Sequence, residues 1–327
     1  MFTPIPLLRL LSPTGFALCA ALALPAPFAA AQDTPDPRLP GAAKLALRGK
    51  AGDTVKMEGK RKVDTRIHFE ALQVEFSAES TVKDNSTYEY RGPGPNGTLQ
   101  IEAHGTTRVT VTNAVGQSAK PITSSRSILC TVRSNLEMVK ATPLGTTRGS
   151  KQVGHTLATA PTVVVSQSFG LVRFPDKPVK AGDTWSGTVT ITEADDLRGA
   201  TLHYTATVVG FEMYQSFPCA HVEVNFNYHG PLPAIEAQSR KTLPKGSKVS
   251  CTGDLTGSET AYYVLDRGWP LNDQTKLTVA LNLVVTANDK QFEVGGTIDV
   301  DDHSAVTGYP PYAPALVPAV ASSPSPN

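Results

Sequence analysis

The chain has 327 residues, and its 30 lysines and arginines nearly balance its 29 aspartates and glutamates. A chain with balanced charge has no electrostatic reason to seek nucleic acid or an anionic membrane, so we expect neither as a partner. The length fits two domains of ordinary size or one large β domain.

The first residues predict export. Arg9 is the only charged side chain before Asp33, an apolar stretch runs over residues 16–28, and three alanines follow at 29–31. This is the order of a secretory signal peptide, so we expect residues 1–31 to be removed and the mature chain to be secreted or periplasmic. The apolar stretch is too short for a spanning helix and is broken by prolines, and no later segment is apolar enough, so no transmembrane span is expected.

A lipid-anchored form is the alternative to a plain signal peptide. Cys19 lies inside the apolar stretch, and bacterial lipoproteins are modified on such a cysteine. Leu18 stands where a lipoprotein signal has a small residue, which favours the plain signal peptide.

Both ends of the mature chain are expected to lie outside the fold. Residues 32–43 are rich in proline, aspartate and alanine and predict a loose leader. Residues 308–327 are rich in proline, alanine and serine and predict a disordered tail, because proline lacks the backbone donor that a strand needs and small residues bury little surface.

Between these ends the sequence alternates polar with β-branched or aromatic residues. The clearest runs are residues 98–102, 107–112, 188–192 and 221–228, and turn signals separate the runs at 92–97, 194–196, 266–268 and 287–289. A period of two places one side of each strand on a core and the other in water, which is typical of antiparallel sheet. We therefore predict an all-β antiparallel meander, folded as a curved sheet, sandwich or half-open barrel, with one short helix at residues 134–140.

One five-residue string occurs twice. Lys50-Ala51-Gly52-Asp53-Thr54 recurs 130 positions later as residues 180–184, and alternating runs follow each copy. Gly-Asp forms tight turns, and the following threonine begins a strand. The repeat predicts two related β halves, at residues 44–160 and 161–307.

Three cysteines remain after export, Cys130, Cys219 and Cys251. An exported chain permits a disulfide, and an odd number leaves one thiol over, so one bridge and one buried thiol are expected. The pairing stays open. A simple hairpin would separate Cys219 from Cys251 by about seven residues, roughly 23 Å at strand rise, which is too far for a bridge.

The second copy of the repeated string lies in a longer motif, Phe174-Pro-Asp-Lys-Pro-Val-Lys-Ala-Gly-Asp-Thr-Trp185. This motif resembles the P-x-x-P-V-K-x-G-D-T-W stretch of a group of uncharacterised secreted bacterial β-proteins, and residues 262–268 resemble their later strand-and-turn segment. The resemblance covers residues 172–285. Such proteins are distantly similar to curved-sheet lipoprotein carriers of the bacterial envelope, which implies a concave apolar groove but brings no catalytic residue.

No motif in the sequence carries a recognisable catalytic site. Nucleophile elbow, zinc-protease, P-loop, dinucleotide and C-x-x-C patterns are all missing, so we expect no enzyme, no catalytic residue and no cofactor. The best metal candidates are Asp299, Asp301 and His303, which alternate onto one strand face; a solvated charged face is the alternative. His221 and His229 are too far apart along a strand to share one ion.

The placement of the large aromatic residues decides between two classes of function. We expect Trp185 and Trp269 to pack in the core, while Phe211, Phe226 and Tyr263 either fill a core or line a groove. A groove would make the chain a binding module for a lipid or another apolar ligand, with its ligand-binding residues unknown. A filled core would make it a structural or protein-interaction scaffold of the cell exterior, and a hydrolase is the third class.

Overall fold

A computed structural model describes residues 39–69, 73–113, 116–145, 172–191, 199–242, 246–287 and 290–310. The chain divides into Met1–Asp36 and Pro37–Asn327, and all described residues belong to the second unit. The expectations for the signal peptide, for most of the leader and for the turn at Asp195-Asp196 fall outside the described residues, as does the tail from residue 311 onward.

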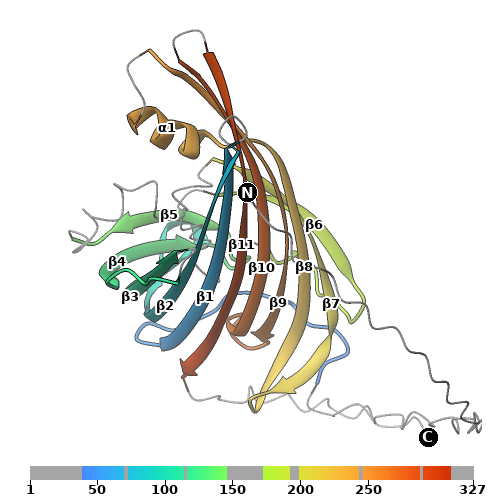
Figure 1. The fold of residues 1–327 in the computed structure, drawn as a ribbon. Helices are drawn as coiled ribbons and strands as arrows, with labels where there is room; N and C mark the ends of the chain where they lie inside the picture. Colours follow the sequence, from blue (N-terminus) through green and yellow to red (C-terminus); the bar gives the residue numbers. More distant parts are fainter. Residues whose placement is uncertain are drawn as a thin grey trace, which may run out of the picture. The chain divides into compact units, whose positions relative to one another are not determined.

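Across the described ranges, eleven strands build one antiparallel sheet (Figure 1). The strands are β1 (Thr54–Phe69), β2 (Val74–Pro93), β3 (Leu99–Asn113), β4 (Ile122–Val132), β5 (Met138–Pro143), β6 (Thr184–Thr190), β7 (Thr201–Tyr214), β8 (Phe217–Pro231), β9 (Lys248–Val264), β10 (Pro270–Ala287) and β11 (Lys290–Gly308). A short 3-10 turn, η2 (Pro95–Gly97), joins β2 to β3, and one α-helix, α1 (Pro233–Thr242), joins β8 to β9.

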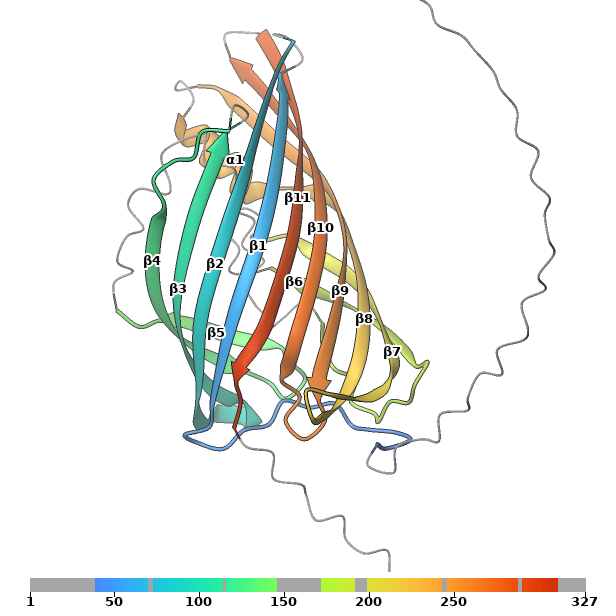
Figure 2. The same ribbon diagram turned by 60° about the horizontal axis from the view of Figure 1, so that its bottom comes forward.

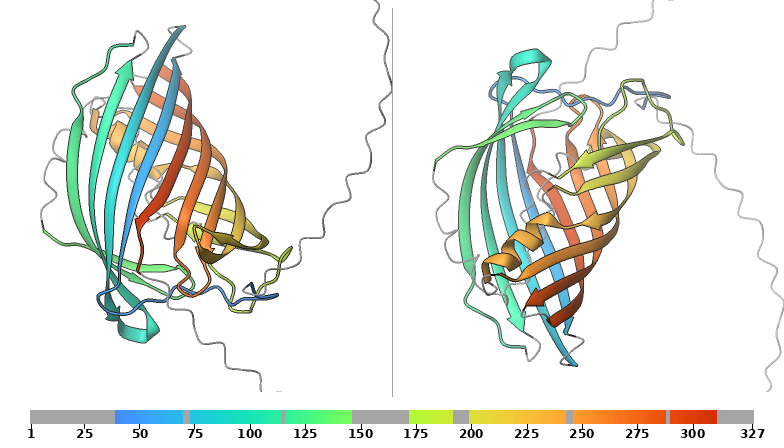
Figure 3. Two further views of the ribbon diagram at one scale, coloured as in Figure 1. Left: turned by 90° about the horizontal axis from the view of Figure 1, so that it is seen from below. Right: turned by 90° about the horizontal axis from the view of Figure 1, so that it is seen from above.

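The strand order is β5-β4-β3-β2-β1-β11-β10-β9-β8-β7-β6, so nearly every strand lies beside its neighbour in the chain (Figure 2). The pair β1 and β11 joins the two halves in the middle of the sheet. The sheet stays open, with β5 and β6 as its edges, and it curves strongly (Figure 3). The predicted all-β meander and curved sheet are therefore confirmed.

Alternation along β1 shows why this sequence forms these strands. Val55, Met57 and Val63 are buried, while Lys56 and Lys62 between them are exposed. We call the side with the buried residues the core face and the opposite side the outer face. Because one slip in register would move all of the apolar side chains to the outer face, this alternation fixes the pairing.

The two copies of the repeated string fold into the same turn. Lys50 N–H donates to Asp53 Oδ2 at 2.9 Å, and Lys180 N–H donates to Asp183 Oδ2 at 2.8 Å. Gly52 and Gly182 both adopt positive φ, at 88° and 84°. Each glycine N–H then donates to the backbone of the next strand, at 2.8 and 2.7 Å. The shared string therefore encodes one strand-initiating turn twice, and a common origin of the two halves stays a prediction.

Gly268 in the β9–β10 turn is a position where a side chain cannot be accommodated. Its φ is 64°, and an added Cβ would lie 2.3 Å from the carbonyl oxygen of Ala46. The substitution Gly268→Ala is therefore expected to lower the free energy of unfolding by at least about 1–2 kcal/mol, measured by thermal melting. Gly41→Ala, whose Cβ would meet nothing within 4 Å, is the control. Equal melting temperatures for the two variants would contradict this account.

The helix predicted at residues 134–140 is wrong. Ser134 to Leu136 lie in a turn, Leu136 has a φ of 70°, and β5 begins at Met138. Cys130 on β4 pairs with Ala141 on β5, so ladder hydrogen bonds to a neighbouring strand override the weak local helical tendency. The described part of the chain instead places its α-helix at α1, and none of its helical segments has the length and apolar character to span a bilayer.

The predicted tail begins too early at residue 308. Gly308 is the last residue of β11, and the ring of Tyr309 packs edge-on against Phe217 with 5.1 Å between centroids. The guanidinium of Arg267 lies 5.8 Å from the centre of the same ring. An aromatic residue among prolines thus belongs to the fold, because it covers a small apolar cluster that includes Cys219.

Candidate functional site

Large side chains fill the core face near the β9–β10 turn. Trp269 is completely buried and packs beside Tyr88, with 5.0 Å between ring centroids. Phe226 and Tyr263 are also buried, and Phe211 packs against the same cluster. These aromatic residues therefore fill a core here.

Trp185 has a structural role as well. It packs against the core, and its indole N–H donates to the carbonyl oxygen of Arg173 at 2.7 Å. The expectation that both tryptophans are packing residues is confirmed.

A belt of polar side chains, buried except for the partly buried Asp84 and Asp302, crosses the middle of the core face. Arg61, Asp302, Thr275 and Glu259 are successive cross-strand neighbours on β1, β11, β10 and β9. Asp84 and Asp273 lie on the same face in the next row. We call these six residues the buried polar belt.

One ion pair anchors the belt. Arg61 is only 4% exposed, and its Nη2 donates to Asp302 Oδ2 at 2.7 Å while Nε donates to the same oxygen at 2.9 Å. Asp84 accepts a hydrogen bond of 2.5 Å from the hydroxyl of Thr107. Burial raises the pKa of Asp302, and the charge of Arg61 opposes that shift.

Two carboxyl groups of the belt are held toward their neutral form. Burial raises the pKa of Glu259 to about 7. The hydroxyl of Tyr263 donates a hydrogen bond to Glu259 Oε1 at 3.2 Å, and this bond opposes the rise in pKa. Burial also raises the pKa of Asp273, and the nearby charges of Glu259 and Asp302 raise it further. The hydroxyl of Thr275 donates a hydrogen bond to Asp273 Oδ1 at 3.1 Å, so a hydroxyl of the core face contacts each of the two carboxyl groups.

Beyond the belt, the core face becomes apolar and opens to solvent. Phe69 follows Arg61 by eight residues on β1, roughly 26 Å at strand rise. Past the buried hydroxyl residues Thr65 and Ser80, the core-facing side chains toward the far ends of β1, β2, β10 and β11 are mostly apolar. We call this set the distal apolar face: Ile67, Phe69, Phe76, Leu281, Leu283, Phe292 and Val294.

Strand register brings the distal apolar face together. Ile67 pairs with Phe76, and Phe69 pairs with Val294, which in turn pairs with Leu283. The rings of Phe69 and Phe76 meet edge-on at 5.7 Å between centroids. These contacts form one continuous apolar surface over four strands.

The distal apolar face is incompletely covered. Phe76 is 59% exposed and Phe292 is 43% exposed, although both are on the core-facing side of their strands. Arg66, His68 and Glu75 occupy the outer face at the same level. The distribution is therefore that of an amphipathic sheet whose apolar side the described residues leave partly exposed at Phe76 and Phe292.

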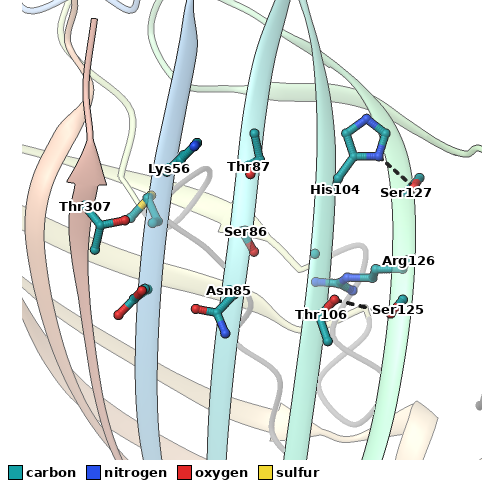
Figure 4. Close-up of a pocket in the computed structure, with 13 residues that line it drawn as sticks. Lys56, Asn85, Ser86, Thr87, His104, Thr106, Ser125, Arg126, Ser127 and Thr307 are labelled. Atoms are coloured by element: carbon teal, nitrogen blue, oxygen red, sulfur yellow. Dashed lines mark hydrogen bonds between the residues drawn. The ribbon is translucent and has the colours of Figure 1, made fainter.

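A second feature is a shallow hollow on the outer face of β1 to β4, with a volume of about 450 Å³ (Figure 4). Its walls are two cross-strand rows of polar side chains, one residue from each strand. The first row is Lys56, Thr87, His104 and Ser127, and the second row is Glu58, Asn85, Thr106 and Ser125. The hollow thus runs across the strands rather than along them.

Hydrogen bonds order the walls of the hollow on β3 and β4. His104 Nδ1 lies 2.8 Å from Ser127 Oγ, and Thr106 Oγ1 lies 3.3 Å from Ser125 Oγ (Figure 4). The other ring nitrogen of His104 lies 2.9 Å from Glu102 Oε1. This site was not predicted from the sequence, although hydroxyl residues cluster at 84–87, 104–107 and 123–127, which is the pattern that points to it.

The candidate metal ligands do share one face of β11, but lysines on both neighbouring strands flank Asp301. Asp301 pairs with Lys62 on β1 and with Lys276 on β10, and Asp299 accepts a hydrogen bond of 2.8 Å from Thr278. Within the described ranges no group of three His, Cys, Asp or Glu residues is placed to hold a metal ion. The solvated charged face is the reading that fits Asp299, Asp301 and His303.

The two histidines of β8 have separate partners. His221 Nδ1 lies 3.1 Å from Glu212 Oε1, and its ring stacks on Tyr262 with 4.6 Å between centroids. His229 contacts Asp254 on the neighbouring strand. The prediction that they do not share an ion is consistent with these contacts.

The expected disulfide is wrong, because the buried cysteines Cys130, Cys219 and Cys251 form no bridge with one another. Cys219 pairs across strands with Val264, which lies thirteen residues beyond Cys251 on β9, roughly 43 Å at strand rise. The offset is larger than a simple hairpin gives because α1 extends the β8–β9 connection beside Cys251. Burial raises the pKa of the Cys219 thiol to about 12 and that of Cys251 to about 11, which makes both poorly reactive.

No family model and no curated protein matches the chain. An outer membrane channel of Pseudomonas putida F1 aligns with a TM-score of 0.28 and 9% identity, over 80% of this chain and 97% of that one. OccK7 of Pseudomonas aeruginosa aligns with a TM-score of 0.20 and 7% identity, over 79% of this chain and 100% of that one. OccK5 of the same organism aligns with a TM-score of 0.21 and 6% identity, over 80% of this chain and 100% of that one. Scores this low carry no argument for a shared fold or function.

Proposed function

We propose that this chain is an exported, non-catalytic binding module that holds a lipid or another apolar ligand against the distal apolar face. The observation that carries the proposal is the exposure of Phe76 and Phe292 on the core-facing side of their strands. Large apolar side chains in that position normally have a cover, and a ligand's hydrocarbon supplies one.

The chemistry of binding is burial without reaction. Each methylene of the ligand that leaves water contributes roughly 0.8 kcal/mol. The distal apolar face spans four strands, about 14 Å between the outermost strand axes, which is wide enough for an acyl chain to lie on. The outer face fits an apolar ligand poorly because its side chains at this level, among them Arg66, His68 and Glu75, are mostly charged or polar.

Native mass spectrometry of residues 32–327, purified from the exported compartment without detergent, tests this proposal. The expected result is an extra mass that organic solvent removes and that fragments as a lipid. A mass equal to that of the chain alone, together with no uptake of a fluorescent fatty acid, would reject the proposal that the chain binds an apolar ligand. The remaining reading would then be a scaffold with contacts along the open edges β5 and β6.

A substitution localises the site. Phe76→Asp is expected to weaken fatty-acid binding roughly thirtyfold, since it removes a large apolar contact and adds a charge. Val209→Asp is the matched control, because Val209 is 47% exposed but lies on β7, away from the distal apolar face. Equal binding by the two variants would place the ligand elsewhere.

A further inference from the structure

We propose that the hollow on the outer face of β1 to β4 is a second binding site, and that its ligand is a linear neutral glycan lying across the strands. This site is independent of the distal apolar face, which belongs to the opposite side of the sheet.

The spacing of the rows fits a polymer. Adjacent strands lie about 4.8 Å apart, so the hollow presents one pair of polar side chains at each such step. On β2 the pair is Thr87 and Asn85, and on β4 it is Ser127 and Ser125, one on each side of the hollow. A chain of pyranose rings has a repeat of similar size and carries hydroxyl groups along both of its edges.

The chemistry of the walls matches hydroxyl groups. Serine and threonine hydroxyls both donate and accept, and the Asn85 amide does the same through separate atoms. A sugar hydroxyl has the same dual character, so each wall residue can pair with it in either direction. The Thr106–Ser125 and His104–Ser127 contacts hold four of these side chains in place before a ligand arrives.

The charge of the hollow favours a neutral ligand. Lys56 and Glu58 end the two rows on β1 with opposite charges, and Arg126 on β4, which also lines the hollow, adds one positive charge. An acidic polymer needs a consistent excess of basic side chains along its path, which this arrangement does not give. A bound peptide strand runs alongside a sheet edge to use backbone hydrogen bonds, whereas this hollow crosses four paired strands, so a peptide is also disfavoured.

The test is an NMR titration of residues 32–327 with cellohexaose and chitohexaose, with heparin as the acidic comparison. We expect at least one neutral glycan to bind with millimolar or better affinity and to shift the amide signals of the two rows. The double variant Asn85→Ala/Thr106→Ala, which truncates one cross-strand pair in the hollow, is expected to weaken that binding at least about tenfold.

The matched control is Thr256→Ala/Thr278→Ala, a cross-strand pair on the same outer face over β9 and β10. It is expected to bind the glycan like the unmodified chain, and thermal melting verifies that both variants fold. Three results would each overturn the proposal: no shift with either neutral glycan at millimolar concentration, equal affinity of the two double variants, or a salt-dependent preference for heparin.

Discussion

Replacing Arg61 by leucine is expected to lower the free energy of unfolding by about 3–5 kcal/mol, which corresponds to a melting temperature roughly 10 °C lower. The guanidinium is buried and donates two hydrogen bonds to one oxygen of Asp302, which is itself largely buried. Without Arg61, that carboxylate remains in an apolar surrounding without its cation. Thermal melting near neutral pH measures the loss.

Two further variants separate this explanation from a general loss of packing. Lys62→Leu, at the neighbouring position on the outer face, removes exposed ion pairs to Asp64 and Glu79 and is expected to change stability by less than about 1 kcal/mol. Arg61→Leu with Asp302→Leu removes both charges and is expected to recover most of the loss. A double variant as unstable as Arg61→Leu alone would show that the ion pair is not the cause.

The loss should also depend on pH. Burial already raises the pKa of Asp302, and removing Arg61 takes away the charge that lowers it. The carboxyl group of the variant therefore takes up a proton at higher pH than in the unmodified chain. As the pH falls and Asp302 becomes neutral, the difference in stability between Arg61→Leu and the unmodified chain is expected to shrink.

The strands of the sheet could be predicted because the alternation of polar and apolar residues lies within each strand. Alternation in residues 221–228 and 107–112 follows from where each side chain points, and this reappears as β8 and β3. The repeated turn was readable for the same reason, since Gly52 and Asp53 make their contacts within a few residues. Strand order beyond adjacent hairpins was not readable, because the pairing of β1 with β11 joins residues more than 200 positions apart.

The candidate sites depend on contacts that no local pattern encodes. Phe69 and Phe292 look like ordinary strand residues in the sequence, and only the registers of β1 and β11 place them on one open surface. The hollow likewise requires three successive registers, from Lys56 through to Ser127. The failed disulfide has the same origin, since an offset along a hairpin depends on the length of its connection.

The buried polar belt contains a second group with a large expected effect, Glu259. Burial raises its pKa from the ordinary value near 4.5 to about 7. Between these two values the folded chain retains a proton that the unfolded chain has already released. The free energy of unfolding therefore falls as the pH rises through this window, and the loss persists at higher pH. Since a difference of one pKa unit corresponds to 1.36 kcal/mol, the total loss of unfolding free energy is on the order of 3 kcal/mol.

Glu259→Gln removes this penalty, because an amide of the same shape stays neutral and still accepts the hydrogen bond from Tyr263. The variant is expected to be about as stable as the unmodified chain at pH 4.5 and more stable at pH 8, by urea unfolding at both values. Glu223→Gln, on the exposed face of β8, is the control and should follow the unmodified chain at both pH values. If Glu259→Gln instead has the same stability as the unmodified chain at both pH values, Glu259 does not carry the buried proton, and the neighbouring Asp273 becomes the group that holds it.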